Sequence, residues 1–189
     1  MGLDGSVWII NPDLLTARLK DVDNLDLLAA NLAAVQRIEA WLDTSIEVHQ
    51  TIGVETVLSS PKYRRLVEKA KANDYEVCFV YIYVDKVERQ FERIRARVAK
   101  GGHDVPPDKV RERRFRSIRQ MPWFFWKANR AWIFDNSADE PSLVAYKFVD
   151  GDPEGQCSIE YMVDKKRLPV EWAYDIDRAV MGLEPDLLD

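Results

Sequence analysis

The sequence predicts an α/β fold, in which helices cover a mostly parallel sheet to form a three-layer sandwich. Two observations predict it. Short runs of β-branched and aromatic residues alternate with longer amphipathic segments along the chain. The run from Glu76 to Val84 (EVCFVYIYV) is almost continuously apolar, which is typical of a central parallel strand covered on both faces.

The first elements are a strand and a helical region. Residues Ser6 to Ile10 form a short run rich in β-formers, and Asn11-Pro12-Asp13 stops it. Pro12 suits the first turn of a helix. Apolar residues then recur at helical spacing as far as Leu42, which predicts either two helices or one broken helix.

The next elements are again a strand and a helix. Glu47 to Leu58 is rich in β-branched residues and predicts a strand. Ser59-Ser60-Pro61 is a helix start signal, and the helix is expected over Lys62 to Asn73. The apolar strand Glu76 to Val84 follows.

The middle of the chain predicts three helices. An amphipathic helix over Val87 to Lys100 ends at Gly101-Gly102, where a left-handed C-cap forms easily. A second basic helix is expected from Asp108 to about Gln120. Met121 to Trp132 carries too many aromatic residues to leave in water and predicts a packed helix.

The last elements are a sheet strand at Trp132-Ile133-Phe134, a hairpin and a helix. Leu143 to Val149 and Gln156 to Met162 are expected to pair as the hairpin, before a short helix around Trp172 to Met181. We expect one domain, with a core over residues 1–142, a lid at about 86–119, and residues 143–189 as an extension of the same domain.

Composition narrows the class of protein. No apolar run approaches the roughly 18 residues that suggest a membrane span, and the N-terminus has no export signal, so a cytoplasmic location is expected. Two cysteines, Cys78 and Cys157, lack metal or redox spacing, and we expect reduced thiols that behave as small buried hydrophobes. The two histidines show no zinc pattern, so no structural metal is expected.

The net charge of −5 is distributed unevenly along the chain. Residues 86–119 contain 12 Lys and Arg against 5 Asp and Glu, while the rest of the chain is acidic. A positive block of this kind indicates either an anionic partner or a solvated helical face, and composition does not separate the two.

Candidate functional residues follow the predicted strands, because ligands of such sheets bind at the carboxyl ends of the strands. Asp13, which opens a helix, can accept a proton from a substrate hydroxyl, or it is simply a first-turn acid. Glu55 is a substrate-binding or a structural acid. The whole set that follows strands is Asn11, Asp13, Glu55, Asp85 and Asp135.

Arginines dominate the basic block. Arg93 and Arg97 share one helical face, whereas Arg95 points elsewhere, and Arg113 and Arg114 follow the glycine turn. Two arginine sets around such a turn suit a lid that carries positive charge to a phosphoryl group. The alternative is a solvated helical hairpin with ordinary ion pairs.

The segments Arg93 to Pro106 (RIRARVAKGGHDVP) and Arg111 to Ser117 (RERRFRS) closely resemble the lid of the zeta-toxin-like P-loop kinases. Three further pieces occur in the order that this family would place them: Asn11-Pro12-Asp13, Glu55-Thr56-Val57-Leu58-Ser59 and Asp135-Asn136-Ser137. The resemblance covers roughly residues 7 to 145 and implies a P-loop NTPase-like fold.

The resemblance implies ATP-dependent phosphoryl transfer, with Mg²⁺, to a small hydroxylated molecule such as a sugar nucleotide. It makes Asp13 the catalytic base and implies the following further roles: Arg93, Arg97, Arg113 and Arg114 as the cationic lid, and Asn11, Glu55 and Ser59 as substrate-binding residues. An antitoxin-type protein partner is left open.

The sequence departs from the family in two places. Val57 stands two residues after the acid, where the family often has a hydroxyl residue. No G-x-x-x-x-G-K-[ST] loop occurs in the chain, so the residues that would hold the phosphates of ATP and Mg²⁺ are missing. We therefore expect either a kinase whose true start lies upstream of Met1, or a non-catalytic binding module derived from one.

A third class, nucleic-acid binding by the basic block, is disfavoured by the sequence. The aromatic cluster follows the basic segment, and the chain as a whole is acidic.

Overall fold

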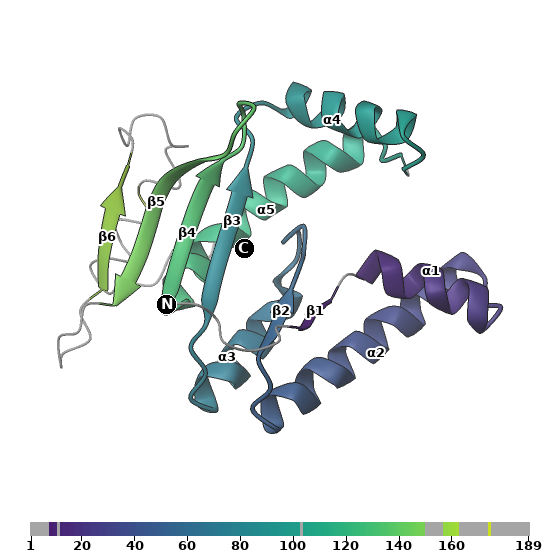
Figure 1. Ribbon diagram of the computed structural model, residues 1–189, viewed down its shortest axis with the longest axis horizontal. Coiled ribbons are helices and arrows are strands. Elements are labelled where there is room, and N and C mark those ends of the chain that lie inside the picture. Colours follow the sequence, from purple (N-terminus) through teal and green to yellow (C-terminus); the bar gives the residue numbers. More distant parts are fainter. Residues whose placement is uncertain (1–7, 11, 103, 150–156, 163–173, 175–189) are drawn as a thin grey trace. The chain divides into compact units, whose positions relative to one another are not determined.

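The structure is a computed structural model and describes residues 8–10, 12–102, 104–149, 157–162 and 174 (Figure 1). It divides into two compact units, each of which is described by itself. The first unit consists of Met1–Val57 and Lys62–Tyr75, and the second of Leu58–Pro61 and Glu76–Asp189. The expected boundary at residues 142/143 falls inside the second unit.

The first unit contains three helices and a two-stranded sheet. Strands β1 (Trp8–Ile10) and β2 (Ile52–Val54) pair in parallel. Helices α1 (Pro12–Val22) and α2 (Leu27–Glu47) are separate, and the Asp26 side chain caps α2 by accepting a hydrogen bond from the Ala29 N–H at 2.8 Å. Their shared core comprises Leu19, Ala30 and Ala34, with Leu15, Leu25 and Ala33 packed against it.

The strand expected over Glu47 to Leu58 is much shorter in the structure. Helix α2 continues to Glu47, and only Ile52–Val54 is a strand. His49 has a left-handed φ of 55°, and its ring stacks on Tyr75 with centroids 5.7 Å apart. The Tyr75 hydroxyl lies 3.0 Å from the carbonyl oxygen of Ser45 and 3.1 Å from that of Gln50. These tertiary contacts fix a turn where β-branched residues alone favour a strand.

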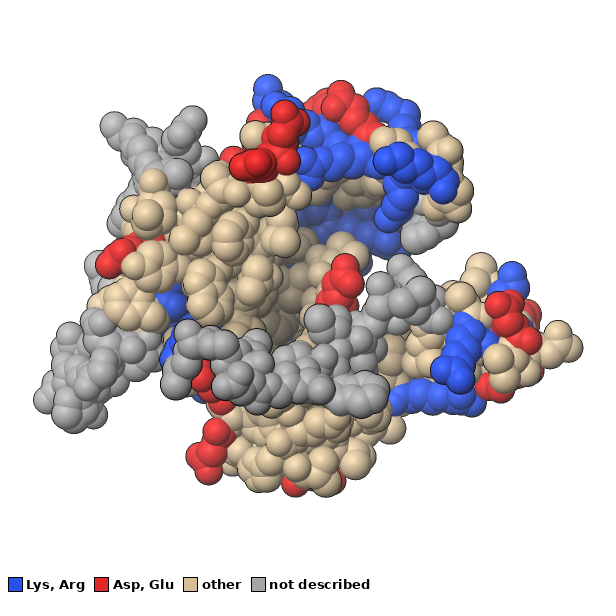
Figure 2. All heavy atoms as spheres, in the orientation of Figure 1, with Lys and Arg blue, Asp and Glu red and all other residues tan. Residues whose placement is uncertain are grey.

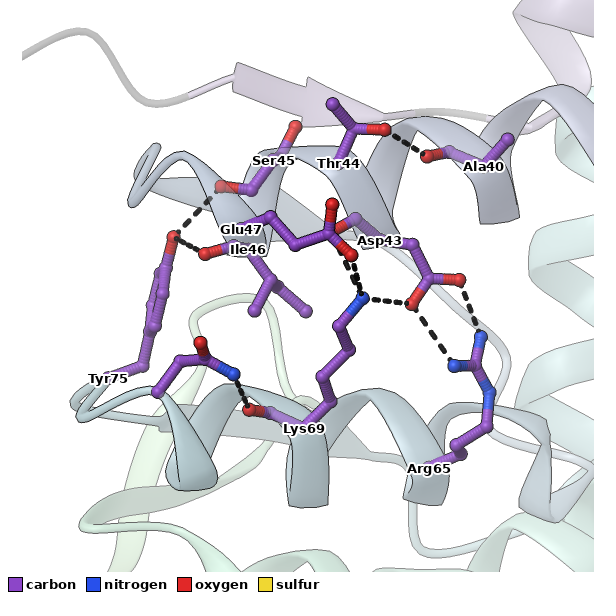
Figure 3. Close-up of polar contacts among 10 residues, drawn as sticks. Ala40, Asp43, Thr44, Ser45, Ile46, Glu47, Arg65, Lys69 and Tyr75 are labelled. Carbon is purple, nitrogen blue, oxygen red and sulfur yellow. Dashed lines mark hydrogen bonds and ion pairs between the residues drawn. The ribbon is translucent and has the colours of Figure 1, made fainter.

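An ion-pair network joins α2 to the third helix of this unit, α3 (Arg64–Ala72), which follows a 3₁₀ turn at Pro61–Tyr63. Arg65 forms two hydrogen bonds to the Asp43 carboxylate, of 3.1 and 2.7 Å, and Lys69 lies 2.9 Å from the same carboxylate and 2.8 Å from Glu47 (Figure 3). The Arg65 and Lys69 hydrogen bonds lower the pKa of Asp43 from 3.8 to about 2.

We expect Asp43→Asn to lower the free energy of unfolding at neutral pH by about 1 kcal/mol, a value discounted for solvent screening. Because the folded-state pKa lies below the unfolded one, the stabilisation is present above the ordinary value of 3.8 and is lost as the pH falls through about 2. Urea unfolding over this pH range measures it, with Glu88→Gln as a control. If the difference in unfolding free energy between the wild-type protein and Asp43→Asn stayed constant over that range, the lowered pKa assigned to Asp43 would be contradicted.

The second unit is built on a four-stranded sheet in the order β3-β4-β5-β6 (Figure 1). Strands β3 (Cys78–Tyr83) and β4 (Arg130–Asp135) are parallel. Strands β5 (Ser142–Val149) and β6 (Cys157–Tyr161) form the expected hairpin, and β5 also pairs antiparallel with β4. The α/β class is confirmed, but this sheet mixes strand directions where a mostly parallel sheet was expected.

The sequence predicts β3 as a central strand covered on both faces, and the structure differs from this prediction. Among the described strands, β4 is the one that pairs with β3. Val80 is 56% and Ile82 58% exposed, and Cys78 is a free thiol on the same exposed face instead of a buried one. The opposite face packs on a helix, where Phe79 stacks on Phe124 with ring centroids 5.9 Å apart.

That helix is α5 (Pro107–Lys127), which is preceded by α4 (Val87–Ala99). The two helices that were expected over Asp108 to Trp132 are one helix, which contains Pro122 and ends at Lys127, before β4 begins at Arg130. Proline removes one backbone hydrogen bond. The fully buried side chains of Met121 and Phe125 flank Pro122, and their packing outweighs that loss.

The expected glycine C-cap of α4 is confirmed. Gly101 has φ +87°, and its N–H donates to the carbonyl of Val98 at 2.9 Å. The Gly102 N–H donates to the carbonyl of Arg97 at 3.0 Å, which completes a Schellman motif. A Cβ on Gly102 would lie 2.6 Å from Cγ of Arg97, so this close approach requires glycine.

Two findings concern the described part of the chain as a whole. None of its helices is both long and apolar enough to cross a membrane. The helix expected around Trp172 to Met181 and the turn between β5 and β6 lie outside the described residues.

Candidate anion-binding site

An open hollow of about 580 Å³ lies at the C-terminal end of α4. It is lined by Arg93, Ala96, Arg97, Lys100, Gly101 and Gly102. The three cations are spaced four and then three residues apart, so they lie on one side of the helix, and the Schellman motif closes that end. Three positive charges beside a helix C-terminus, which itself carries partial negative charge, suit a ligand with more than one phosphate or carboxylate group.

Two arginines of the hairpin formed by α4 and α5 are anchored at the carboxyl ends of the parallel strands. Arg93 donates to the carbonyl of Asn136, just after β4, at 2.6 Å. Arg114 donates to the carbonyls of Val84 and Asp85, just after β3, at 2.5 and 2.9 Å. Arg114 is therefore a positioning residue, whereas Arg93 both lines the hollow and reaches the strand end.

The strand ends themselves form a polar cluster. The Asp85 N–H donates to the Ser137 hydroxyl at 2.8 Å, and that hydroxyl donates to the Asp135 carboxylate. The Asp85 carboxylate accepts from the Lys86 N–H at 2.7 Å and from Arg89 at 2.9 Å. Burial acts to raise the pKa of Asp85, but the polar contacts with Ser137, Lys86 and Arg89 outweigh it and leave the pKa lowered.

The second unit thus brings together part of the residue set predicted from sequence. Arg93 and Arg97 share the hollow, while Arg113 is exposed on α5 and does not line it. Ser59 belongs to this unit and is half-buried in a loop.

The remaining predicted residues belong to the first unit. Asp13 lies in the first turn of α1, as expected, but its side chain and the whole of Asn11 lie outside what the structure describes. Glu55 is exposed and follows β2 directly, at the expected strand end. Because the two units are described separately, these acids and the arginines do not form one described site.

Sequence reasoning missed Lys100 and the structural roles of Arg114 and Ser137. The position of Lys100, seven residues after Arg93 on the same helical side, was a usable signal. No sequence signal indicates that Arg114 binds backbone carbonyls, because its partners lie about 30 residues away in the chain.

Comparison with known proteins identifies a similar protein but does not indicate an activity for this chain. No family model and no solved structure matches the chain. An uncharacterized protein of Haemophilus influenzae is 35% identical over 104 residues, which is 55% of this chain. The match covers 66% of that relative, just under two thirds of its length.

Proposed function

We propose that this chain is the substrate-binding and lid part of a zeta-toxin-like kinase, which transfers a phosphoryl group from ATP to a small hydroxylated substrate such as a sugar nucleotide. The observation that carries the proposal is the hollow lined by Arg93, Arg97 and Lys100 in a hairpin anchored at the carboxyl ends of two parallel strands. The cytoplasmic location expected from the sequence belongs to the same proposal.

The residues present do not fit Mg²⁺-ATP. Within the described ranges, no three His, Cys, Asp or Glu side chains come together to hold a metal ion. The sequence contains no phosphate-binding loop of the G-x-x-x-x-G-K-[ST] type. No step of phosphoryl transfer is therefore derived for this chain, and the roles proposed for its own residues are to bind and orient the phosphate groups of a ligand.

We expect Arg97→Ala and Lys100→Ala each to weaken binding of a nucleotide-activated amino sugar by roughly 10- to 100-fold, because each removes a charge-assisted hydrogen bond. Isothermal titration calorimetry measures the change. Arg95→Ala is the matched control, since Arg95 lies on the same helix and carries the same charge but does not line the hollow. Equal losses for Arg95→Ala and Arg97→Ala would contradict the proposed site.

The second candidate is a non-catalytic module that binds the same ligand. The absence of the phosphate-binding loop from the sequence favours it. Binding of the amino-sugar nucleotide without ATP-dependent product formation supports this candidate, and product formation by the 189-residue chain contradicts it. Both candidates share the hollow, so calorimetry tests the site and a turnover assay tests the chemistry.

A further inference from the structure

The basic helix α5 carries a large aromatic side chain in water. Phe115 lies within residues 86–119 and is 61% exposed. The aromatic cluster that follows this basic segment is inside the protein, since Trp123, Phe124 and Phe125 are buried. Phe115 is different, because it stays at the surface among cations.

One arginine side chain lies over this ring, and a second lies one helical turn before it. The Arg119 guanidinium lies over the Phe115 ring, 5.4 Å from its centroid. Arg111, one helical turn before Phe115, lies 4.9 Å over the ring of Phe91 from α4. Because Arg111, Phe115 and Arg119 are each four residues apart, they form a row of cation, ring and cation along one side of α5.

The positive charge of this surface is only partly neutralised. Glu112 pairs with both Lys109, at 3.0 Å, and Arg116, at 2.7 Å. Among the described residues, no carboxylate forms a salt bridge with Arg111 or Arg113. Lys and Arg atoms accordingly gather over the α4 and α5 hairpin at the top of Figure 2. Residues 86–119 carry 12 Lys and Arg against 5 Asp and Glu, and this net positive charge favours an anionic partner.

We propose that the row Arg111, Phe115 and Arg119 binds single-stranded nucleic acid. Two different chemistries meet here: guanidinium groups attract a phosphate backbone, and an exposed ring between them stacks on an unpaired base. An acidic peptide would use the arginines but gain little from a flat, water-exposed ring. A duplex keeps its bases inside and offers the ring nothing to stack on.

The experiment is fluorescence anisotropy with a labelled single-stranded oligonucleotide of about ten nucleotides, a length within the range that such grooves bind. We expect Phe115→Ala to weaken binding roughly 5- to 100-fold, which corresponds to the loss of one stacked base. Phe115→Trp should retain binding, because it preserves the stacking surface. Arg111→Ala should weaken binding and also make the salt dependence shallower, by about 0.7 in the log–log slope for each phosphate that the variant no longer neutralises.

Two controls distinguish base stacking on Phe115 from general binding by the second unit. Val80→Ala removes an exposed apolar side chain elsewhere in the same unit and should leave binding unchanged. Arg97→Ala tests independence from the hollow of the proposed function and should leave the stacking effect of Phe115 intact. Absence of salt-dependent binding overturns the inference. So does binding that Phe115→Ala leaves unchanged, because a purely electrostatic surface would behave in that way.

Discussion

The substitution Lys147→Met is expected to lower the free energy of unfolding by about 3 kcal/mol, because it removes the hydrogen-bond donor to carbonyls at the buried C-terminal end of α5. Lys147 is 5% exposed on β5. Its ammonium group donates to the carbonyls of Phe125 at 3.1 Å, Trp126 at 2.5 Å and Ala128 at 2.7 Å.

These carbonyls belong to the last turn and cap of α5, which have no partners within the helix. A positive charge at a helix C-terminus also interacts favourably with the helix dipole. Methionine keeps the length and apolar stem of lysine but has no donor, so the variant isolates the loss of the cap.

Urea unfolding followed by tryptophan fluorescence measures the change, since Trp123, Trp126 and Trp132 all lie in the second unit. Lys86→Met, at an exposed lysine of the same unit, is the control and should change stability by less than about 0.5 kcal/mol. Similar effects of the two substitutions would show that the three carbonyls do not depend on Lys147.

Phe125→Ala is expected to lower the free energy of unfolding by about 3 to 5 kcal/mol, since it opens a cavity at a fully buried position. Phe125 is among the largest fully buried side chains of the described residues, as are Met121 on α5 and Ile133 on β4. Its loss removes buried packing close to Pro122 inside α5.

The same urea unfolding measures it, with Phe125→Leu as a smaller truncation that should cost about 1 kcal/mol. Val80→Ala, at a 56% exposed position, is the surface control. If Phe125→Ala proved as mild as Val80→Ala, the continuous α5 helix with its buried face would be wrong.

Local sequence signals located most elements because they depend on neighbouring residues. Pro12 marks a helix start and Gly101 marks a helix end, through backbone conformations and hydrogen bonds made within a few residues. Helices α1 to α4 and the β5 and β6 hairpin follow from such signals.

Errors arose where a distant contact decides the outcome. Two helices were expected where α5 is one, because buried side chains on both sides of Pro122 carry the helix through it. The first part of the strand predicted over Glu47 to Leu58 is a helix end and a turn, and only Ile52–Val54 is a strand, because the Tyr75 hydroxyl binds the carbonyls of Ser45 and Gln50. Cys78 is exposed because it lies on the same face of β3 as the exposed Val80 and Ile82, and no local pattern reveals which face of a strand is covered.

For the candidate site, the sequence by itself determined the identity of the cations and their helical spacing, since residues four apart on a helix share a side whatever surrounds it. Tertiary structure alone decided their roles. Arg114 binds the end of β3, Arg93 reaches the end of β4, Lys100 joins the hollow and Phe115 stays in water. The reason is physical: a side chain's partner is set by which segments pack beside it, and those segments lie far away in the chain.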